Sequence, residues 1–197
     1  PPRKSLSMFR RAFKIPNLGL LLTLTFLSTF VFAGLESTFA MWSRRQFGWG
    51  PEQNGYLFAF VGLLSALIQG GLIGRLTKKF GEAQLIIQGA LALSIGIAMI
   101  PFSSNIVILI IAMSIAGYGF SVTSPALNSL ISLQAGEEEM GEIMGVTRSA
   151  STMARFIGPA WAGLLFGSFG INWPYFGGAL IMLVVVVLGV KNLKTIN

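Results

Sequence analysis

The chain has 197 residues, of which 53% are hydrophobic and only 11% are charged, and its mean hydropathy is +0.73. This composition excludes a water-soluble domain, which must cover its surface with polar side chains. Cysteine and histidine are absent from the sequence, which excludes disulfides, Cys/His metal sites and histidine general-base catalysis. The sequence also has no visible nucleophile–base pair or set of metal ligands, so we expect neither an enzyme, nor a bound metal, nor a cofactor.

The apolar residues fall into six runs, and a helix that crosses a bilayer needs about 20 mainly apolar residues. Residues 1–16 form a basic segment before the first run, and residues 17–197 form the bundle of spans. The six transmembrane helices are predicted at about residues 18–42, 56–76, 85–100, 106–133, 143–166 and 173–190. The predicted fold class is therefore all-α and integral to the membrane, with both termini on the same side.

The basic residues are concentrated on one side of the predicted spans. On the side of the termini they are Arg3, Lys4, Arg10, Arg11, Lys14, Arg75, Lys78, Lys79, Lys191 and Lys194. Arg44 and Arg45 fall on the opposite side. Because cytoplasmic loops are enriched in Lys and Arg, we expect both termini in the cytoplasm, and the net charge of +7 does not indicate a nucleic-acid partner. Trp42, Trp49 and Trp173 then lie at the outer interface, where indole rings are favoured.

The spans differ in polarity in a pattern that repeats along the chain. The third and sixth carry almost no polar residues. The first, second, fourth and fifth carry polar or charged side chains, namely Glu36, Gln69, Thr123, Asn128, Ser151 and Arg155. Polar side chains within a membrane face a protein interior or a cavity, whereas apolar helices face lipid. Two successive triplets of spans, each with two polar and one apolar member, suggest a three-plus-three inverted repeat.

Two charged residues lie deep inside predicted spans. Arg155 lies about 18 Å from the start of its span at about 1.5 Å per residue, near the middle of a core about 30 Å thick. Glu36 is the only carboxylate within a span, so any protonation site within the spans is Glu36. Arg155, Glu36, Gln69 and Asn128 are predicted to line a cavity. Alternatively, Glu36 forms a structural ion pair with Arg155 or with the arginines of the outer loop.

An acidic run connects the fourth and fifth spans. It contains Glu137, Glu138, Glu139 and Glu142. A run of this kind is usually a solvated connection. Alternatively, some of its carboxylates pair with Arg148 or with the basic loop and lock one conformation.

The segment between the second and third spans reads GGLIGRLTKKFGEA, and Gly74, Leu76, Lys79 and Gly81 within it share a recognisable spacing. They match the loop signature G-x-L-x-D-[RK]-x-G-[RK]-[RK], so the segment resembles that of the major facilitator superfamily. Lys78 occupies the acidic position of the signature, and its last two basic positions are also replaced. Such degeneracy is typical of the second copy of this motif, which lies in the C-terminal half of family members.

Longer segments extend the resemblance over nearly the whole chain. Residues 26–76 are similar to helices seven and eight of drug:proton antiporters that resemble tetracycline-resistance proteins. Residues 117–132 and 141–167 are similar to helices ten and eleven of the same proteins. The resemblance implies the C-terminal six-helix half of a twelve-helix major facilitator fold, a multi-pass protein of the cell (inner or plasma) membrane.

The resemblance also implies a function, namely secondary active transport of a small amphipathic solute by alternating access, with proton-coupled drug efflux as the expected activity. It implies that the cavity lined by Arg155, Glu36, Gln69 and Asn128 binds the substrate, and that Glu36 is the proton-coupling candidate. The implied partners are the lipid bilayer, the small-molecule substrate, protons and a missing N-terminal six-helix half, or a second copy of the chain. Because the chain begins with Pro1, we expect it to be a piece of a longer protein. A sugar or metabolite transporter of the same fold and a non-transporting membrane scaffold or regulatory protein are the alternatives.

Overall fold

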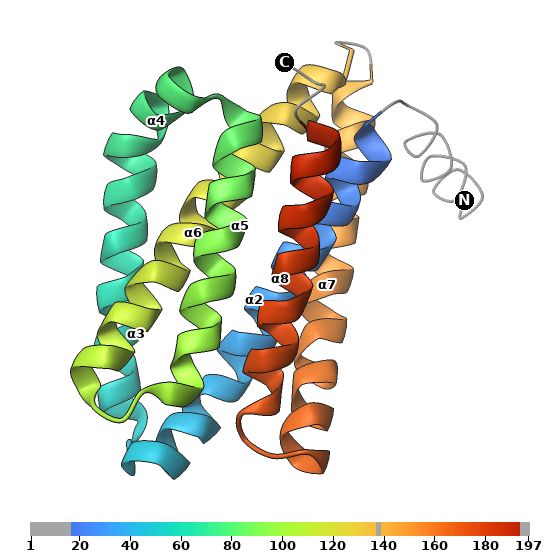
Figure 1. The fold of residues 1–197 in the computed structure, drawn as a ribbon. Helices are drawn as coiled ribbons and strands as arrows, with labels where there is room; N and C mark the ends of the chain where they lie inside the picture. Colours follow the sequence, from blue (N-terminus) through green and yellow to red (C-terminus); the bar gives the residue numbers. More distant parts are fainter. Residues whose placement is uncertain (1–16, 137–138, 194–197) are drawn as a thin grey trace.

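The structure is a computed structural model that describes residues 17–136 and 139–193, and the regular elements within these ranges are all helices (Figure 1). The predicted basic segment, residues 1–16, lies outside the described residues, as do Glu137 and Glu138 of the acidic run. In chain order the elements are α2 (Leu18–Phe47), α3 (Pro51–Leu67), η1 (Ile68–Leu72), α4 (Ile73–Phe80), α5 (Glu82–Met99), η2 (Ile100–Phe102), α6 (Ile106–Gln134), α7 (Met140–Ser168) and α8 (Trp173–Asn192).

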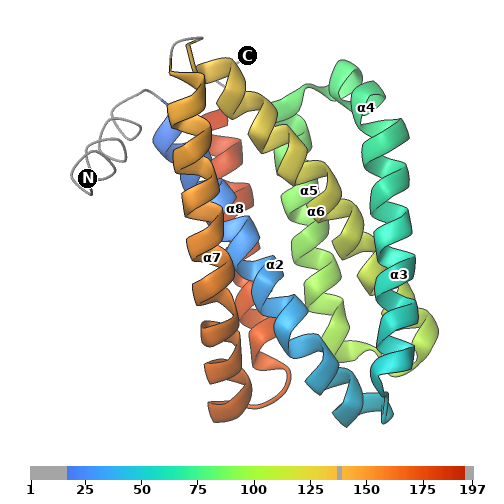
Figure 2. The ribbon, with the colours of Figure 1, turned by 180° about the vertical axis from the view of Figure 1, so that it is seen from behind.

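Five helical segments in the described part of the chain are long and apolar enough to cross a membrane. They are Leu18–Phe47, Pro51–Phe80, Glu82–Phe102, Ile106–Gln134 and Trp173–Asn192. The remaining long helix, α7, has 29 residues, more than the roughly 20 that a crossing needs. Its charged residues Glu142, Arg148 and Arg155 make it more polar. α7 nevertheless packs along α2 through the depth of the bundle (Figure 2), as expected of a multi-pass membrane protein.

Several helices extend beyond their predicted ends because polar residues continue them. α2 runs to Phe47 instead of residue 42, so Arg44 and Arg45 lie in its last turn, where basic side chains are favourable. α3 begins at Pro51 instead of about residue 56, since proline suits the first helical turn. The Gly50 N–H also donates a hydrogen bond of 3.0 Å to the Gln53 side chain and caps this helix.

The packing of the helices follows the symmetry expected of a three-plus-three repeat. The first triplet of spans is α2, α3 (continued by α4) and α5, and the second is α6, α7 and α8. Exchanging the two triplets turns the α5–α6 contact into the α8–α2 contact, and the α2–α7 contact into the α6–α3 contact. All four of these contacts are present. α2 begins and α8 ends at one end of the bundle, which we call the terminal end, and the α2–α3 and α7–α8 connections lie at the opposite, distal end (Figure 1).

Two helix pairs approach so closely that only glycine fits between them. A Cβ atom on Gly158 of α7 would overlap the carbonyl oxygen of Phe30 in α2, and a Cβ atom on Gly96 of α5 would overlap the backbone nitrogen of Ala116 in α6. In a membrane, where helices gain little from the hydrophobic effect, close packing of small residues is a main source of association. The α2–α7 and α5–α6 pairs are therefore the tightly joined parts of the bundle.

Polar side chains also join helices that are distant in sequence. The Ser94 hydroxyl of α5 donates a hydrogen bond of 2.8 Å to the carbonyl oxygen of Ala179 in α8. At the distal end, the Trp42 indole donates a hydrogen bond of 2.9 Å to the side chain of Asn172. Trp42 is fully buried, and at this end it connects α2 to the start of α8. Trp173 is half exposed at the same end.

Candidate functional site

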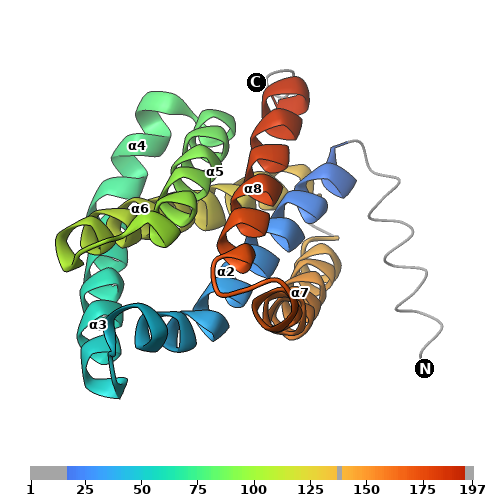
Figure 3. The same cartoon turned by 60° about the horizontal axis from the view of Figure 1, so that its bottom comes forward.

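α2, α3, α6 and α7 form the side of the bundle that is opposite α5 and α8 (Figures 2 and 3). These are the helices on which the sequence placed the candidate cavity residues. Glu36, Gln69, Asn128 and Arg155 are all exposed in the described structure. α3 is the most exposed of the long helices, with Asn54 and Leu57 as its buried residues. The polar side chains on this side of the bundle are therefore not covered by any other described helix.

Glu36 and Arg155 approach each other between α2 and α7. The Arg155 Nη1 atom lies 4.0 Å from Glu36 Oε2, and the two side chains are 56% and 50% exposed. It is the only salt bridge among the residues that the structure describes. Two unit charges at this separation attract by about 1 kcal/mol in bulk water and about 4 kcal/mol at an effective dielectric constant of about 20. A pair this long and this exposed is weak enough for either partner to exchange it for another ligand.

The arginines predicted as alternative partners of Glu36 have other neighbours. The Arg45 guanidinium lies over the ring of Phe166, with its carbon 5.1 Å from the ring centroid. Arg44 lines a separate hollow at the α2–α3 connection, together with Trp49 and Asn54. Of the pairings that the sequence left open, the structure contains the one between Glu36 and Arg155.

A polar groove of about 370 Å³ lies between α6 and α7. Its lining consists of Asn128 from α6 and six residues of α7, namely Met144, Thr147, Arg148, Ser151, Thr152 and Arg155. Thr147 and Thr152 donate their hydroxyl hydrogens to the carbonyl oxygens of Ile143 and Arg148, both at 2.9 Å. The guanidinium groups of the two arginines and the Asn128 amide therefore supply most of the hydrogen-bond donors of this groove.

Some of the predicted site residues line this groove, but not all of them. Asn128 and Arg155 line it, and Glu36 reaches it through Arg155, whereas Gln69 lies in η1 and is not part of its lining. Arg148 is a lining residue that the sequence suggested only as a partner of the acidic run. Its distance of seven residues from Arg155 is close to two helical turns, which places both arginines on one side of α7.

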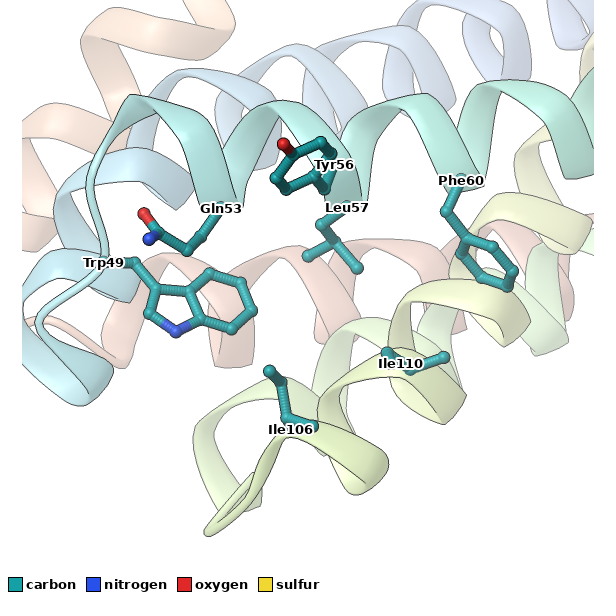
Figure 4. Close-up of a pocket in the computed structure, with 7 residues that line it drawn as sticks. All are labelled: Trp49, Gln53, Tyr56, Leu57, Phe60, Ile106 and Ile110. Atoms are coloured by element: carbon teal, nitrogen blue, oxygen red, sulfur yellow. The ribbon is translucent and has the colours of Figure 1, made fainter.

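A second hollow, of about 300 Å³, lies between the beginnings of α3 and α6 (Figure 4). Its lining is Trp49, Gln53, Tyr56, Leu57, Phe60, Ile106 and Ile110, and side chains of α3 face those of α6 across it. Two polar groups of this lining are already engaged, because the Gln53 side-chain oxygen accepts from the Gly50 N–H and the Tyr56 hydroxyl donates to Glu52 at 3.1 Å. The hollow therefore offers a hydrocarbon surface and contains none of the predicted site residues.

The residues predicted as a loop motif are mostly helical. Gly74, Leu76 and Lys79 lie in α4, which extends to Phe80. Gly81 alone separates α4 from α5, and its φ of 77° lies in the region that favours glycine. The expected loop is thus the last two turns of the rod formed by α3, η1 and α4, followed by a sharp turn.

The position after this turn departs from the family signature and makes a contact of its own. Glu82, where the signature has a basic residue, accepts a hydrogen bond of 3.1 Å from the Ser129 hydroxyl. This bond joins the beginning of α5 to α6, next to Asn128 of the polar groove. The turn is therefore attached to the helix that carries one wall of the groove.

Comparisons with known proteins agree with this architecture. The Major Facilitator Superfamily profile matches residues 21–195. The chain is 28% identical over 153 residues to Major facilitator superfamily domain-containing protein 10 of Mus musculus, covering 78% of the chain and 33% of the relative. It is 25% identical over 167 residues to Tetracycline resistance protein, class C, of Escherichia coli, covering 85% of the chain and 42% of the relative.

A solved structure shows the same fold. The crystal structure of the human organic anion transporter MFSD10 (TETRAN) superposes with a TM-score of 0.85 at 23% identity, over 94% of this chain and 46% of that one. The chain therefore spans between a third and a half of the length of these proteins. From the extent of the family match and the agreement in fold, the chain belongs to the Major Facilitator Superfamily, and its described helices form half of that fold.

Proposed function

We propose that the chain is the C-terminal six-helix half of a secondary transporter in the cell membrane, with its termini in the cytoplasm. It moves a small amphipathic solute by alternating access and is coupled to protons, as in drug efflux. The relatives named Tetracycline resistance protein, class C, and Multidrug resistance protein 2 support this activity. The other half of the pathway comes from an N-terminal six-helix half or from a second copy of the chain.

The observation that carries the proposal is the half-exposed ion pair of Glu36 and Arg155. A charge near the middle of a membrane costs at least about 2.5–3.5 kcal/mol, so such residues face a partner or water. A pair that holds two helices together is most effective when it is short and enclosed, because water screens an exposed pair. This pair is long and open, on the side of the bundle opposite α5 and α8, where a second half completes the pathway.

Glu36 is the group of this pair that can bind a proton. Protonation removes its charge and releases Arg155, whereas deprotonation restores the pair. The neighbouring helices bring few other ionisable groups to α2. Besides Arg155, α7 contains Glu142 and Arg148, both nearer its beginning and neither in a salt bridge with Glu36. α6 contains Tyr118, which faces α3 across an apolar hollow, and α8 contains the buried Tyr175 and, at the terminal end, Lys191. In α3, Glu52 and Tyr56 bond to each other. Arg155 is therefore the charge that responds to a proton on Glu36.

Transport by the full-length parent in proteoliposomes tests the proposal. A pH gradient is imposed, and the uptake of several fluorescent amphipathic solutes is measured for the parent and for Glu36→Gln. We expect Glu36→Gln to lose proton-driven accumulation at least tenfold but to retain exchange of labelled for unlabelled solute, because exchange needs no net proton movement. Glu52→Gln, at an exposed carboxylate of the α3 start, is the matched control.

Other outcomes distinguish the alternatives. Full proton-driven accumulation by Glu36→Gln would show that Glu36 carries no coupling proton. A parent that is folded and inserted but moves no solute of any charge would indicate a scaffold instead of a transporter.

A further inference from the structure

We infer that the groove between α6 and α7 binds the anionic group of the transported solute, with Arg148 as a binding residue beside Arg155. This inference rests on the proposed transport function and specifies its substrate as an amphipathic anion, such as a carboxylate, sulfonate or phosphate ester. Arg148 has no part in the ion pair with Glu36, and its assignment comes from the composition of the groove alone.

The first argument is the charge balance of the groove. Its lining contains two arginines and no carboxylate. Among the described residues, the only acidic side chain paired with either arginine is Glu36, which lies on α2 outside the lining. Glu139 and Glu142, the described members of the acidic run, form no salt bridge with Arg148. The groove thus has an excess of positive charge, which a bound anion compensates.

The second argument is the supply of hydrogen-bond donors. Guanidinium groups present several N–H donors in a planar fork that matches a carboxylate, sulfonate or phosphate. Asn128 adds an amide on the opposite wall, and its side chain has no hydrogen bond to the rest of the described structure. The threonine hydroxyls are occupied as donors to backbone carbonyl oxygens. The donors left free are therefore those of the guanidinium groups, the Asn128 amide and the Ser151 hydroxyl, all of which suit an anion.

The third argument is the position of the arginines along α7. Arg148 lies about 12 Å and Arg155 about 22 Å from the beginning of the helix, at about 1.5 Å per residue. Since α7 begins at the terminal end of the bundle (Figure 2), Arg148 is the first of the two that an anion meets from that end. Arg155, at the middle of the helix, then binds the anion in competition with Glu36. The two side chains form successive contacts for one anionic group.

The experiment uses a pair of fluorescent probes that differ in charge and share a phenylnaphthylamine skeleton. Anilinonaphthalenesulfonate carries a permanent anion, and N-phenylnaphthylamine lacks the sulfonate. Binding is titrated to the full-length parent in nanodiscs, with empty nanodiscs subtracted. We expect Arg148→Gln to weaken sulfonate binding about tenfold or more and to leave binding of the uncharged probe within about twofold. Arg148→Lys keeps the charge and recovers part of the affinity.

The control is Arg45→Gln, which removes an arginine at the distal end, where it lies over Phe166. We expect it to bind both probes as the parent does. Unchanged sulfonate binding by Arg148→Gln would overturn the inference. Equal weakening of both probes would also overturn it, since Arg148 would then stabilise a conformation instead of binding the anion. A parent that transports uncharged or cationic solutes and binds both probes equally well would refute only the anionic substrate class. The proposed transport function would then remain intact.

Discussion

In the proposed binding mode Arg155 has two competing partners, Glu36 and the bound anion, and their competition determines how a proton acts on the site. Glu36 lies 4.0 Å away on α2, and the polar groove lies on the other side of Arg155, along α7. A proton on Glu36 removes the first partner and leaves the guanidinium available to an anion. An anion in the groove in turn weakens the hold of Arg155 on the carboxylate. Proton binding and anion binding therefore favour each other at this site.

The competition predicts that anion binding depends on the charge of residue 36. In Glu36→Gln the affinity for anilinonaphthalenesulfonate is expected to exceed that of the parent, because a neutral side chain no longer neutralises Arg155. The uncharged N-phenylnaphthylamine is expected to bind both proteins alike. The measurement is a pair of binding titrations in nanodiscs. A Glu36→Gln protein that binds the sulfonate no better than the parent would contradict this prediction.

The coupling has a consequence for efflux against protons. A proton and an anion that bind together at Glu36 and Arg155 travel in the same direction. If the transported solute is an anion, this pair by itself therefore favours co-transport with a proton, and exchange for protons would require a second carboxylate that competes with the solute.

Glu36 and Arg155 can be identified from the sequence because charges inside apolar runs are rare and energetically costly. Glu36 and Arg155 therefore stood out individually, although their proximity did not follow from spacing along the chain. Arg148 did not stand out, since it lies near the polar beginning of its span, where an arginine is unremarkable. Gln69 meets the same polarity criterion, but a single amide in an exposed helix does not indicate which groove it lines.

The contact between α2 and α7 sets the position of the two charged residues. Gly158 lies one turn from Arg155 and fits directly against the Phe30 carbonyl of α2. Because this contact joins backbones, it leaves no room for a side chain to adjust. The separation of Glu36 and Arg155 therefore depends on the size of the residue at position 158.

Substituting alanine for Gly158 is expected to force the two helices apart. Overpacking of this kind costs typically about 1–3 kcal/mol, so we expect a lower Tm and a loss of proton-driven transport. Gly163→Ala, on the same helix but with open space around the added methyl group, is the matched control. Thermal unfolding followed by size-exclusion chromatography of detergent-solubilised protein measures both. Equal Tm values for the two variants would show that α2 and α7 do not depend on this contact.

The existence of the helices followed from their apolar runs, but their ends did not. Polar residues that continue a helix, such as Arg44 at the end of α2 or Gln53 at the start of α3, are as polar as loop residues. Hydropathy therefore does not distinguish them from a loop. For this reason the motif around Lys79 was expected in a loop and is found in α4. The tight pairing of α2 with α7 depends on glycines whose partners lie far along the chain. Hydropathy does not contain that information.

The arrangement of polar and apolar spans separates two environments across the bundle. α2, α3, α6 and α7 carry the polar groups on one side, and α5 and α8 lie together on the other (Figures 1 and 2). Both sides expose residues in the described structure. The proposed function assigns water and the second half of the transporter to the first side and lipid to the second.

Cysteine labelling distinguishes these environments, because the chain contains no cysteine of its own. Thr152→Cys places a thiol in the polar groove, and Leu183→Cys places one on α8, at positions that are both exposed in the described structure. In a parent without other cysteines, we expect a charged methanethiosulfonate to modify the first at least ten times faster, because lipid suppresses the reactive thiolate. Similar rates at the two positions would contradict the assignment of the two sides.

The π-helical segment η1 interrupts the long rod between α3 and α4 with two adjacent glycines, Gly70 and Gly71. A π turn closes its hydrogen bond over five residues instead of four, so it amounts to one extra residue inserted in an α-helix. If the same residues were wound as a regular α-helix instead, everything beyond η1 would rotate by about 100°, the angle of one residue. Lys78 and Lys79 would then emerge on a different side of the rod, although the sequence of the span would be the same. The π turn thus sets the direction in which the basic end of the rod faces.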